Sequence, residues 1–385
     1  MQSRETSRIS RWPHRRIDRS QSLHAADRSR LRPKRSSPSF PNVPHLVAAP
    51  DKFRGTASAG EAAAAMADAA RQAGWTADEL PMSDGGEGLL DALGGTTHTT
   101  TVADPLGRPV DAQWRMLDTD DPAGPTAVVE MSQAAGRSRL PHPKGDDPVR
   151  ADTTGVGQLL LAARDAGARR IVIGCGGSAT TDGGLGAFEA VGSPAALGQV
   201  DLVVACDVTT SFTDAATVFG PQKGATPEQV ELLTRRLQDL AAHYRATMGV
   251  DVTTVPGAGA AGGLGGGLLV LGARLLPGFG LVAELVGLPH RVEVADLVVT
   301  GEGHLDPPSF KGKVPGGVLQ LARARPAPVP VLCVVGGADR AVLAHPPEGM
   351  EVRSLVALYG RARARRDTVA LIGHTTAEFL EAFCP

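Results

Sequence analysis

The chain has 385 residues, of which 42% are hydrophobic and only 4% aromatic, so its core is expected to consist mainly of Ala, Val and Leu. This length suffices for two domains of ordinary size. The formal net charge of −2 excludes a general attraction to nucleic acid, and no apolar run approaches the roughly 18 residues of a membrane-spanning helix.

The first 44 residues differ in composition from the rest of the chain. They contain 11 Lys and Arg and three acidic residues, a net charge of +8 (11 − 3), which leaves about −10 for the remainder (−2 − 8). Abundant Ser and Pro and little apolar periodicity predict a disordered tail. A nucleic-acid arm and an Arg/Ser-rich targeting peptide are alternatives. We favour a tail without function, or a start codon assigned too early, because the first predicted strand begins directly after it.

Deletion of residues 1–44 is expected to leave turnover and melting temperature unchanged, because this segment has too little apolar surface to add to a core. Activity assays and thermal melts of the shortened and full-length chains test this. A clear fall in either quantity would show that the tail packs or binds.

The first predicted element is a short apolar strand at 45–49, followed by a charged loop. Ser58 and Glu61 form a capping box at the start of an Ala-rich helix over 61–73. Strand, loop and capped helix are the first half of a βαβ unit, in which ligands bind beyond the carboxyl ends of the strands. Three loop residues are therefore candidates for ligand binding, with an ordinary solvated loop as the alternative: Asp51, Lys52 and Arg54.

A second acidic loop lies at 83–88, where Asp84 and Glu87 stand among three glycines. Carboxylates in this setting suit a metal ion or sugar-like hydroxyls better than a core. The next predicted elements are a turn at 104–108, strands at 110–117 and 127–131, and a helix at 155–166.

The most distinctive stretch is Gly174–Gly186, which follows a predicted strand at 170–173 and leads into a helix. Six of its 13 residues are Gly, so backbone N–H groups can approach an anion closely. Strand, glycine turn and helix start form the usual geometry of a phosphate site, and Asp182 adds a carboxylate for a metal ion. The stretch is neither a Walker A loop nor a dinucleotide-binding fingerprint, and a tight turn in an α/β core is the alternative.

Two further candidates follow. A predicted strand at 202–205 is followed by Asp207, and Lys223 precedes a helix predicted from its N-cap Thr226 to about Tyr244. A lysine at a helix N-terminus can add charge to an anion site, although a surface lysine is the commoner case.

A second glycine-rich loop occupies 256–267, with seven Gly in 12 residues and no Lys or hydroxyl. Alone it predicts a flexible or closely packed turn, followed by an apolar helix at 268–276. Glu302, Asp306, Lys311 and Lys313 then follow a predicted strand at 296–300. The last predicted elements are a helix at 318–324, strands at 329–335 and 354–359, and a closing helix at 368–383.

Together these loops contain the groups that phosphoryl transfer requires. Amides and cations bind phosphate oxygens, carboxylates hold Mg²⁺, and one carboxylate accepts the proton of the acceptor hydroxyl. A hydride-transfer enzyme would need the dinucleotide fingerprint, which is absent from the sequence.

Six sequence blocks, in this order, resemble the bacterial glycerate kinases of glycerate and galactarate utilisation over about residues 45–383: A-P-D-K-F-R-G (49–55), S-D-G-G-E-G (83–88), G-C-G-G-S-A-T-T-D-G-G (174–184), F-G-P-Q-K-G-A (219–225), G-A-A-G-G-L-G (259–265) and G-E-G-H-L-D (301–306). The resemblance implies an ATP- and Mg²⁺-dependent kinase that converts D-glycerate to a phosphoglycerate, typically the 2-phospho product. It also implies an α/β fold of two domains with the active site in the cleft between them. We expect a discontinuous doubly wound, Rossmann-like domain over 45–80 and 290–385, and an inserted domain over 81–289.

Each candidate residue has an expected role, inferred from its charge and from its position in a glycine-flanked loop, most of which follow predicted strands. Catalytic roles are expected for Asp182, Glu302, Asp306 and Lys313, and the first two are also the expected metal ligands. Substrate binding is expected from Asp51, Lys52, Arg54, Asp84, Glu87 and Asp207. Nucleotide or phosphate binding is expected from Gly176, Gly177, Ser178, Thr180, Lys223, Gly262 and Gly263. Any of the carboxylates could serve as the base.

The chain departs from the family pattern at several points, including a shorter loop after Asp207 and His304 in place of a usual Arg. A kinase for a related small hydroxy acid and a catalytically weak relative that binds a nucleotide or metabolite are therefore alternatives. The four Cys are far apart and lack a zinc-binding spacing, which favours free thiols and a cytoplasmic location. The expected partners are D-glycerate and a second copy of the chain, with no nucleic acid and no membrane.

Overall fold

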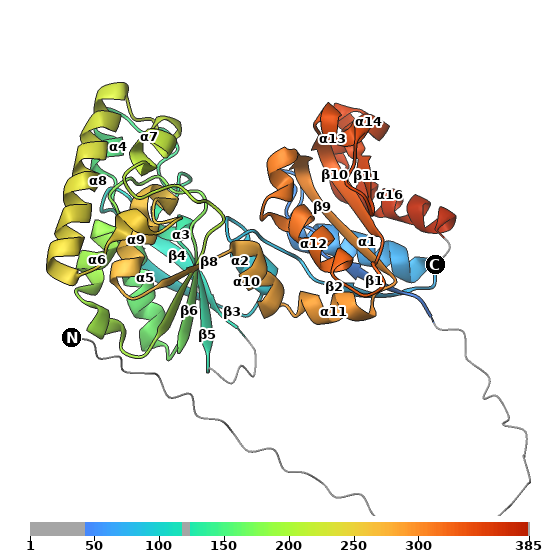
Figure 1. Cartoon of the computed structure of the whole chain (residues 1–385), viewed down its shortest axis with the longest axis horizontal. Coiled ribbons are helices and arrows are strands. Elements are labelled where there is room, and N and C mark those ends of the chain that lie inside the picture. Colours follow the sequence, from blue (N-terminus) through green and yellow to red (C-terminus); the bar gives the residue numbers. More distant parts are fainter. Residues whose placement is uncertain (1–42, 118–123, 384–385) are drawn as a thin grey trace, which may run out of the picture. The chain divides into compact units, whose positions relative to one another are not determined.

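The computed structural model describes residues 43–117 and 124–383. The tail predicted at 1–44 lies outside these residues except for Val43 and Pro44, and so does Cys384. The strands of the described chain form two sheets, one of five strands and one of six (Figure 1).

The five-stranded sheet is parallel throughout and has the strand order β11-β10-β9-β1-β2. Its strands are β1 (His45–Ala48), β2 (Thr76–Glu79), β9 (Leu297–Leu305), β10 (Val331–Ala338) and β11 (Met350–Ser354). Because β1 pairs with both β2 and β9, segments from early and late in the chain meet in one sheet. We therefore propose the domain division expected from the sequence.

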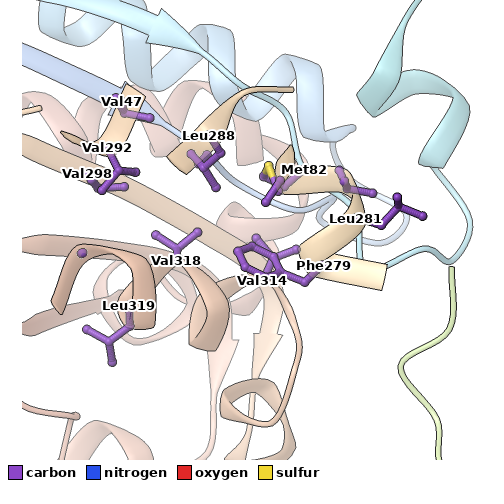
Figure 2. Packing of buried hydrophobic residues seen from close by; sticks show 14 of the residues in the cluster. Val47, Met82, Phe279, Leu281, Leu288, Val292, Val298, Val314, Val318 and Leu319 are labelled. Atoms are coloured by element: carbon purple, nitrogen blue, oxygen red, sulfur yellow. The ribbon is translucent and has the colours of Figure 1, made fainter. Parts of the chain in front are cut away.

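Helices cover both faces of this sheet. On one face, α1 (Ala59–Gln72) and α16 (Thr368–Ala382) contribute to a core that includes Leu46 and Leu297. On the other face, α11 (Leu288–Val294) and α12 (Val314–Arg323) pack with Val47 and Val298, as Figure 2 shows. Neighbouring strand residues thus enter different cores, as expected of a doubly wound sheet.

The six-stranded sheet is mixed and has the strand order β3-β4-β5-β6-β7-β8. The first three strands pair antiparallel, and the pairs from β5 to β8 are parallel. Its strands are β3 (Thr96–Ala103), β4 (Pro109–Met116), β5 (Thr126–Glu130), β6 (Arg170–Gly174), β7 (Asp201–Ala205) and β8 (Arg274–Leu276). The parallel half supplies the glycine-rich and acidic loops that follow β6 and β7.

The remaining helices pack around the second sheet or connect the two sheets. They are α2 (Leu89–Leu93), α3 (Ser132–Ala135), α4 (Asp147–Arg150), α5 (Thr154–Asp165), α6 (Leu185–Val191), α7 (Ala215–Phe219), α8 (Pro227–Met248), α9 (Ala260–Val270) and α10 (Gly278–Leu285). Three more short helices belong to the C-terminal part: α13 (Arg340–Ala344), α14 (Leu355–Tyr359) and α15 (Arg361–Arg366). Single 3₁₀ turns are η1 (Pro194–Leu197), η2 (Pro221–Lys223), η3 (Val252–Thr254) and η4 (Pro307–Phe310). No helix of the described chain combines the length and apolarity needed to cross a membrane.

The capping box predicted at Ser58 is confirmed, and the predicted N-cap Thr226 forms a second capping box. The hydroxyl of Ser58 accepts a hydrogen bond from the backbone N–H of Glu61, and the backbone N–H of Ser58 donates to the Glu61 carboxylate. Thr226 and Gln229 make the same two bonds, with the amide oxygen of Gln229 as the side-chain acceptor. These side chains satisfy donors at the starts of α1 and α8 that would otherwise lack partners. Local chemistry of this kind is readable from the sequence alone.

The helix predicted at 268–276 is wrong, because α9 begins inside the second glycine loop and Arg274–Leu276 form strand β8. The glycines of α9 are contact points: a Cβ on Gly267 would lie 2.7 Å from the Cα of Gly184. Close packing against the first glycine loop therefore outweighs the low helix propensity of glycine.

The strand predicted at 354–359 is also wrong. The strand β11 ends at Ser354, whose hydroxyl accepts a hydrogen bond from the backbone N–H of Ala357 at 3.4 Å and caps α14. The strand itself carries Glu351 and Arg353, so it lacks the apolar run that marks a buried strand. In β9 the predicted end at Thr300 is too early, because the strand continues to Leu305.

Candidate active site

A cavity of about 330 Å³ is lined by residues that follow strands β6 and β7, and we call it the glycine-loop cavity. Residues just after parallel strands in an open α/β sheet are where ligands usually bind. Its wall includes many of the residues singled out from the sequence: Arg54, Asp84, Glu87, Gly176, Gly177, Ser178, Asp207 and Lys223. Other predicted residues lie elsewhere: Asp51, Lys52, Thr180, Asp182, Gly262, Gly263, Glu302, Asp306 and Lys313.

The loops at 83–88 and 174–178 form part of this wall and pack closely on each other. A Cβ on Gly176 would lie 2.5 Å from the Cα of Gly86, and a Cβ on Gly177 would lie 2.1 Å from Oε1 of Glu87. Gly177 also has a φ of +71°, which disfavours any other residue. These glycines therefore hold the 83–88 loop, with its two carboxylates, against the 174–178 loop.

Asp182 anchors the far end of the first glycine loop. Its Oδ2 accepts hydrogen bonds from the N–H and the hydroxyl of Thr153, at 2.9 and 2.7 Å, and from the N–H of Gly186 at 3.1 Å. Its Oδ1 accepts one from the N–H of Gly184 at 3.2 Å. Burial raises the pKa of this carboxyl, and the four bonds oppose the shift. Both oxygens accept hydrogen bonds, so we propose that Asp182 positions α5 and α6, and its expected role as metal ligand or base stays a prediction.

Replacing Asp182 by Asn is expected to lower the free energy of unfolding by about 1–3 kcal/mol, because an amide cannot accept all four bonds. Urea unfolding of Asp182→Asn measures this. The exposed Asp165→Asn is the control, and its surface pair with Arg164 contributes little. A stable Asp182→Asn protein whose turnover falls on the order of 100-fold would instead restore the catalytic role expected from the sequence.

Lys223 places a buried ammonium group on the wall of the cavity. Its side chain is nearly inaccessible, at 6% exposure, and Nζ donates a hydrogen bond to the carbonyl of Thr180 at 2.5 Å. Burial lowers the pKa of Lys223 to about 7, with Asp182 opposing this shift and Arg137 adding to it. Among the described residues, Thr180 is the one hydrogen-bond acceptor of this ammonium group, which leaves two of its donors for an anion.

The second glycine loop supports this lysine instead of lining the cavity with its glycines. Gly262 has a φ of +74°, and a Cβ there would lie 2.0 Å from the carbonyl oxygen of Thr180 and 2.8 Å from Nζ of Lys223. The carbonyl of Gly262 also accepts a hydrogen bond from Gly183 at 3.0 Å. The closely packed turn predicted for this loop is thus present, and Ala260 and Ala261 are its contribution to the cavity wall.

An acidic group adjoins the cavity. Burial raises the pKa of Asp51 to about 6 and the pKa of Asp207 to about 7, and in each case the charge of Asp84 adds to the shift. Burial likewise raises the pKa of Glu302 to about 7, with a further contribution from Asp51. Asp51 and Asp207 follow strands β1 and β7, and Glu302 lies within β9, so the fold assembles the group from both sheets.

Two of these carboxylates keep an unpaired oxygen. Asp207 accepts a hydrogen bond on Oδ1 from the N–H of Gly278 at 2.7 Å, but its Oδ2 is buried without a partner among the described residues. Glu302 is only 8% exposed, and its Oε1 is also buried without a hydrogen-bond partner among the described residues. A buried carboxylate oxygen without a partner is costly, so these atoms are the best-placed acceptors for a ligand.

Two lysines adjoin the acidic group. Nζ of Lys52 lies 3.7 Å from Oδ1 of Asp51. The charge of Lys313 lowers the pKa of both Asp207 and Glu302, so it lies within reach of both. Oδ1 of Asp306 accepts hydrogen bonds from the N–H and hydroxyl of Ser309 and caps η4, and the expected catalytic role of Asp306 stays a prediction.

The donor atoms of the site determine how it could hold Mg²⁺. Among residues 43–117 and 124–383, no group of three or more His, Cys, Asp or Glu side chains is arranged to hold a metal ion. Mg²⁺ in kinases usually takes one or two carboxylates, and phosphates and water complete its shell. The free oxygens of Asp207 and Glu302 fit that mode, whereas both oxygens of Asp182 already accept hydrogen bonds.

Sequence reasoning missed several residues on the cavity wall. Arg137 is the most informative, because its guanidinium donates to the carbonyl of Gln222 at 3.3 Å and stands near Lys223. It follows a short helix and belongs to no motif. Cys175 and Cys206 also line the cavity as free thiols, and only their positions just after β6 and β7 hinted at this.

Comparison with known proteins places the chain among its relatives. A model of the Glycerate kinase family matches residues 46–196 and 192–378. The glycerate kinases of Halalkalibacterium halodurans and Bacillus subtilis are each 38% identical to this chain, over 76% and 77% of it and 85% of each relative. Glycerate 2-kinase of Escherichia coli is 36% identical over 74% of this chain and 83% of the relative.

A solved structure resembles this chain over most of its length. The crystal structure attributed to glycerate kinase 2 from Salmonella typhimurium LT2 matches with a TM-score of 0.73 and 32% identity, covering 89% of this chain and 99% of that one. Sequence blocks, fold and relatives agree: this chain belongs to the glycerate kinase family.

Proposed function

We propose that this protein transfers the γ-phosphoryl group of ATP to a hydroxyl of D-glycerate, giving 2-phosphoglycerate and ADP. The observation that carries the proposal is the pair of buried, unpartnered carboxylate oxygens on Asp207 and Glu302, beside a cavity built from glycine loops and a buried lysine. The family membership and the name of the E. coli relative, Glycerate 2-kinase, support the choice of reaction.

The phosphate end of the reaction is assigned to the glycine-loop cavity. Lys223 and Arg137 supply cations, and the backbone N–H groups of 176–178 supply further donors. Fixed donors in a site shielded from water stabilise the charge that spreads over the transferring phosphoryl group. Mg²⁺, held by Asp207 with Asp84 beside it, would neutralise phosphate charge when bound.

The acceptor end is assigned to the acidic group. Arg54, on the wall of the glycine-loop cavity and of a neighbouring cavity lined by Asp51 and Lys52, would bind the glycerate carboxylate. Glu302 would accept the proton of the attacking hydroxyl through its free Oε1. A carboxyl pKa of about 7 suits this task, because the base is then substantially ionised at neutral pH yet still basic enough to accept a proton.

A substrate panel tests the proposal. The purified full chain is incubated with ATP, Mg²⁺ and a series of small hydroxy acids, ADP is measured, and phosphorus NMR identifies the product. D-glycerate is expected to give the highest kcat/KM and a 2-phospho product. Turnover of another hydroxy acid alone would support a different acceptor, and nucleotide binding without any turnover would support a weak or sensory relative.

Two smaller proposals accompany this function. The three described Cys are free thiols, which supports a reducing cytoplasm as the compartment. The homodimer expected from the sequence stays a prediction that sedimentation analysis can test.

A further inference from the structure

The helix α15 carries four arginines in six residues, and they fall into two pairs. Arg363 and Arg366 both lie near the carboxylate of Asp367, at 3.9 and 2.9 Å. Arg361 and Arg365 stand four positions apart, on one face of the helix. Neither has an ion-pair partner within 43–117 and 124–383.

Both unpaired arginines line a cavity of about 520 Å³, which we call the arginine cavity. Arg54 from the loop after β1 and His304 from β9 line it too. No Asp or Glu of the described chain belongs to its wall; the carboxylate of Asp339 lies beside it, 3.1 Å from Nε2 of His304.

The backbone of the wall leaves room for a ligand near the ends of strands β9, β10 and β11. Gly303, Gly336 and Gly337 contribute to it, together with the strand-end residue Ser354. A Cβ on Gly336 would lie 2.5 Å from the carbonyl oxygen of Gly303, so the two strands require glycine here. The carboxyl edge of a doubly wound sheet is the usual ligand position in such folds.

Electrostatics indicates the sign of the ligand. Three solvent-exposed guanidinium groups share one wall without a balancing carboxylate on it, and like charges held close together repel each other. Guanidinium groups also offer planar pairs of donors that match phosphate oxygens. On the same helix, the two arginines that face away from the cavity are paired, so lack of a partner is confined to the cavity side.

We propose that the arginine cavity binds a phosphate group, with Arg361 and Arg365 as its dedicated ligands. Arg54 lines this cavity and the glycine-loop cavity, so phosphate bound here would lie next to the proposed reaction site. The phosphate can come from the nucleotide or from a separate phosphorylated molecule. The inference does not depend on the proposed reaction, because binding is measured directly.

The experiment compares two double variants of the full chain that remove equal charge from the same helix. Arg361→Gln/Arg365→Gln removes the cavity pair, and Arg363→Gln/Arg366→Gln is the matched control. Each pair is also made with Lys223→Met, which suppresses anion binding in the glycine-loop cavity. Circular dichroism and melting temperature without ligand verify folding, and calorimetric titrations use inorganic phosphate and ADP as probes.

Arg361→Gln/Arg365→Gln is expected to weaken phosphate binding about tenfold or more in both backgrounds. The phosphate affinity of the control variant should stay within about twofold of the parent's. If the phosphate belongs to the nucleotide, ADP affinity falls in parallel and the KM for ATP rises. If it belongs to a separate molecule, ADP affinity and the KM for ATP are unchanged while phosphate binding is lost. Equal phosphate affinities in the two double variants would overturn the proposal, whatever the outcome of the glycerate assay.

Discussion

Replacing Glu302 by Gln is expected to reduce kcat on the order of 100-fold or more while the protein stays folded. The amide keeps the size of the side chain but cannot accept a proton, and loss of a positioned general base commonly costs this much. The buried, unpartnered Oε1 is the reason for choosing this residue among the acidic group. Steady-state kinetics with D-glycerate, ATP and Mg²⁺ measure the effect, and the exposed Glu351→Gln is a control that should retain full activity.

The pH dependence provides a second readout for the same variant. Burial raises the pKa of Glu302 to about 7, so activity should rise with pH through that value as the base ionises. The stability of the fold should change in the opposite direction and fall as pH rises. Since the folded-state pKa lies above its ordinary value of 4.5, the protonated carboxyl stabilises the fold at low pH, and this contribution is lost as pH rises from about 4.5 to about 7.

Glu302→Gln should therefore melt at a higher temperature than the parent at pH 8 and at nearly the same temperature at pH 4. A variant that keeps near-normal kcat and an unchanged pH profile would exclude Glu302 as the base and leave Asp207, which has the second free oxygen, as the remaining candidate. A variant that melts lower at every pH would show that the hydrogen bond between Ser309 and the carboxylate outweighs the cost of its burial.

Replacing Lys223 by Met is expected to lower kcat/KM for ATP on the order of 100-fold, because a fixed cation in a site shielded from water stabilises transferring phosphate strongly. Met preserves the buried apolar stem. The lost bond to the carbonyl of Thr180 should cost some stability, so melting temperatures are measured with the kinetics. The exposed Lys144→Met serves as the control.

The same lysine predicts a pH effect on ATP binding. Burial lowers its pKa to about 7, so the unliganded site loses positive charge as pH rises above that value. The KM for ATP should rise above pH 7 in the parent and show a weaker dependence in Lys223→Met. Unchanged nucleotide kinetics in the variant would remove the glycine-loop cavity as the phosphate site and favour the arginine cavity in its place.

Local features were predictable because a short segment determines them. The capping boxes at Ser58 and Thr226 and the strand–glycine–helix pattern at Gly174–Gly186 depend on neighbours within a few residues. The acidic group is different. The charge of Asp51 raises the pKa of Glu302 although the two residues are far apart in the chain. Only the pairing of β1 with β9 brings them together.

Asp182 illustrates a second reason why a site is hard to predict from sequence: a motif does not show which groups its residues will contact. A carboxylate in a glycine loop has the same sequence signature whether it binds a metal ion or accepts hydrogen bonds from two helix starts. Thr153, which occupies it most strongly, lies 29 residues earlier in a segment that carries no motif. Arg137 and the α15 arginines were missed for a related reason, since a single arginine has no periodicity or spacing that marks its destination.

The strand order also determines when each sheet can be completed during synthesis. All six strands of the second sheet lie between Thr96 and Leu276, so their pairings are available before the rest of the chain leaves the ribosome. In the five-stranded sheet, β1 must wait for β9, which begins about 250 residues later. Until then the apolar edge of β1 can pair only with β2. A nascent chain stalled near residue 290 therefore presents an open parallel edge, and this is the stage at which a chaperone that shields strands would matter most.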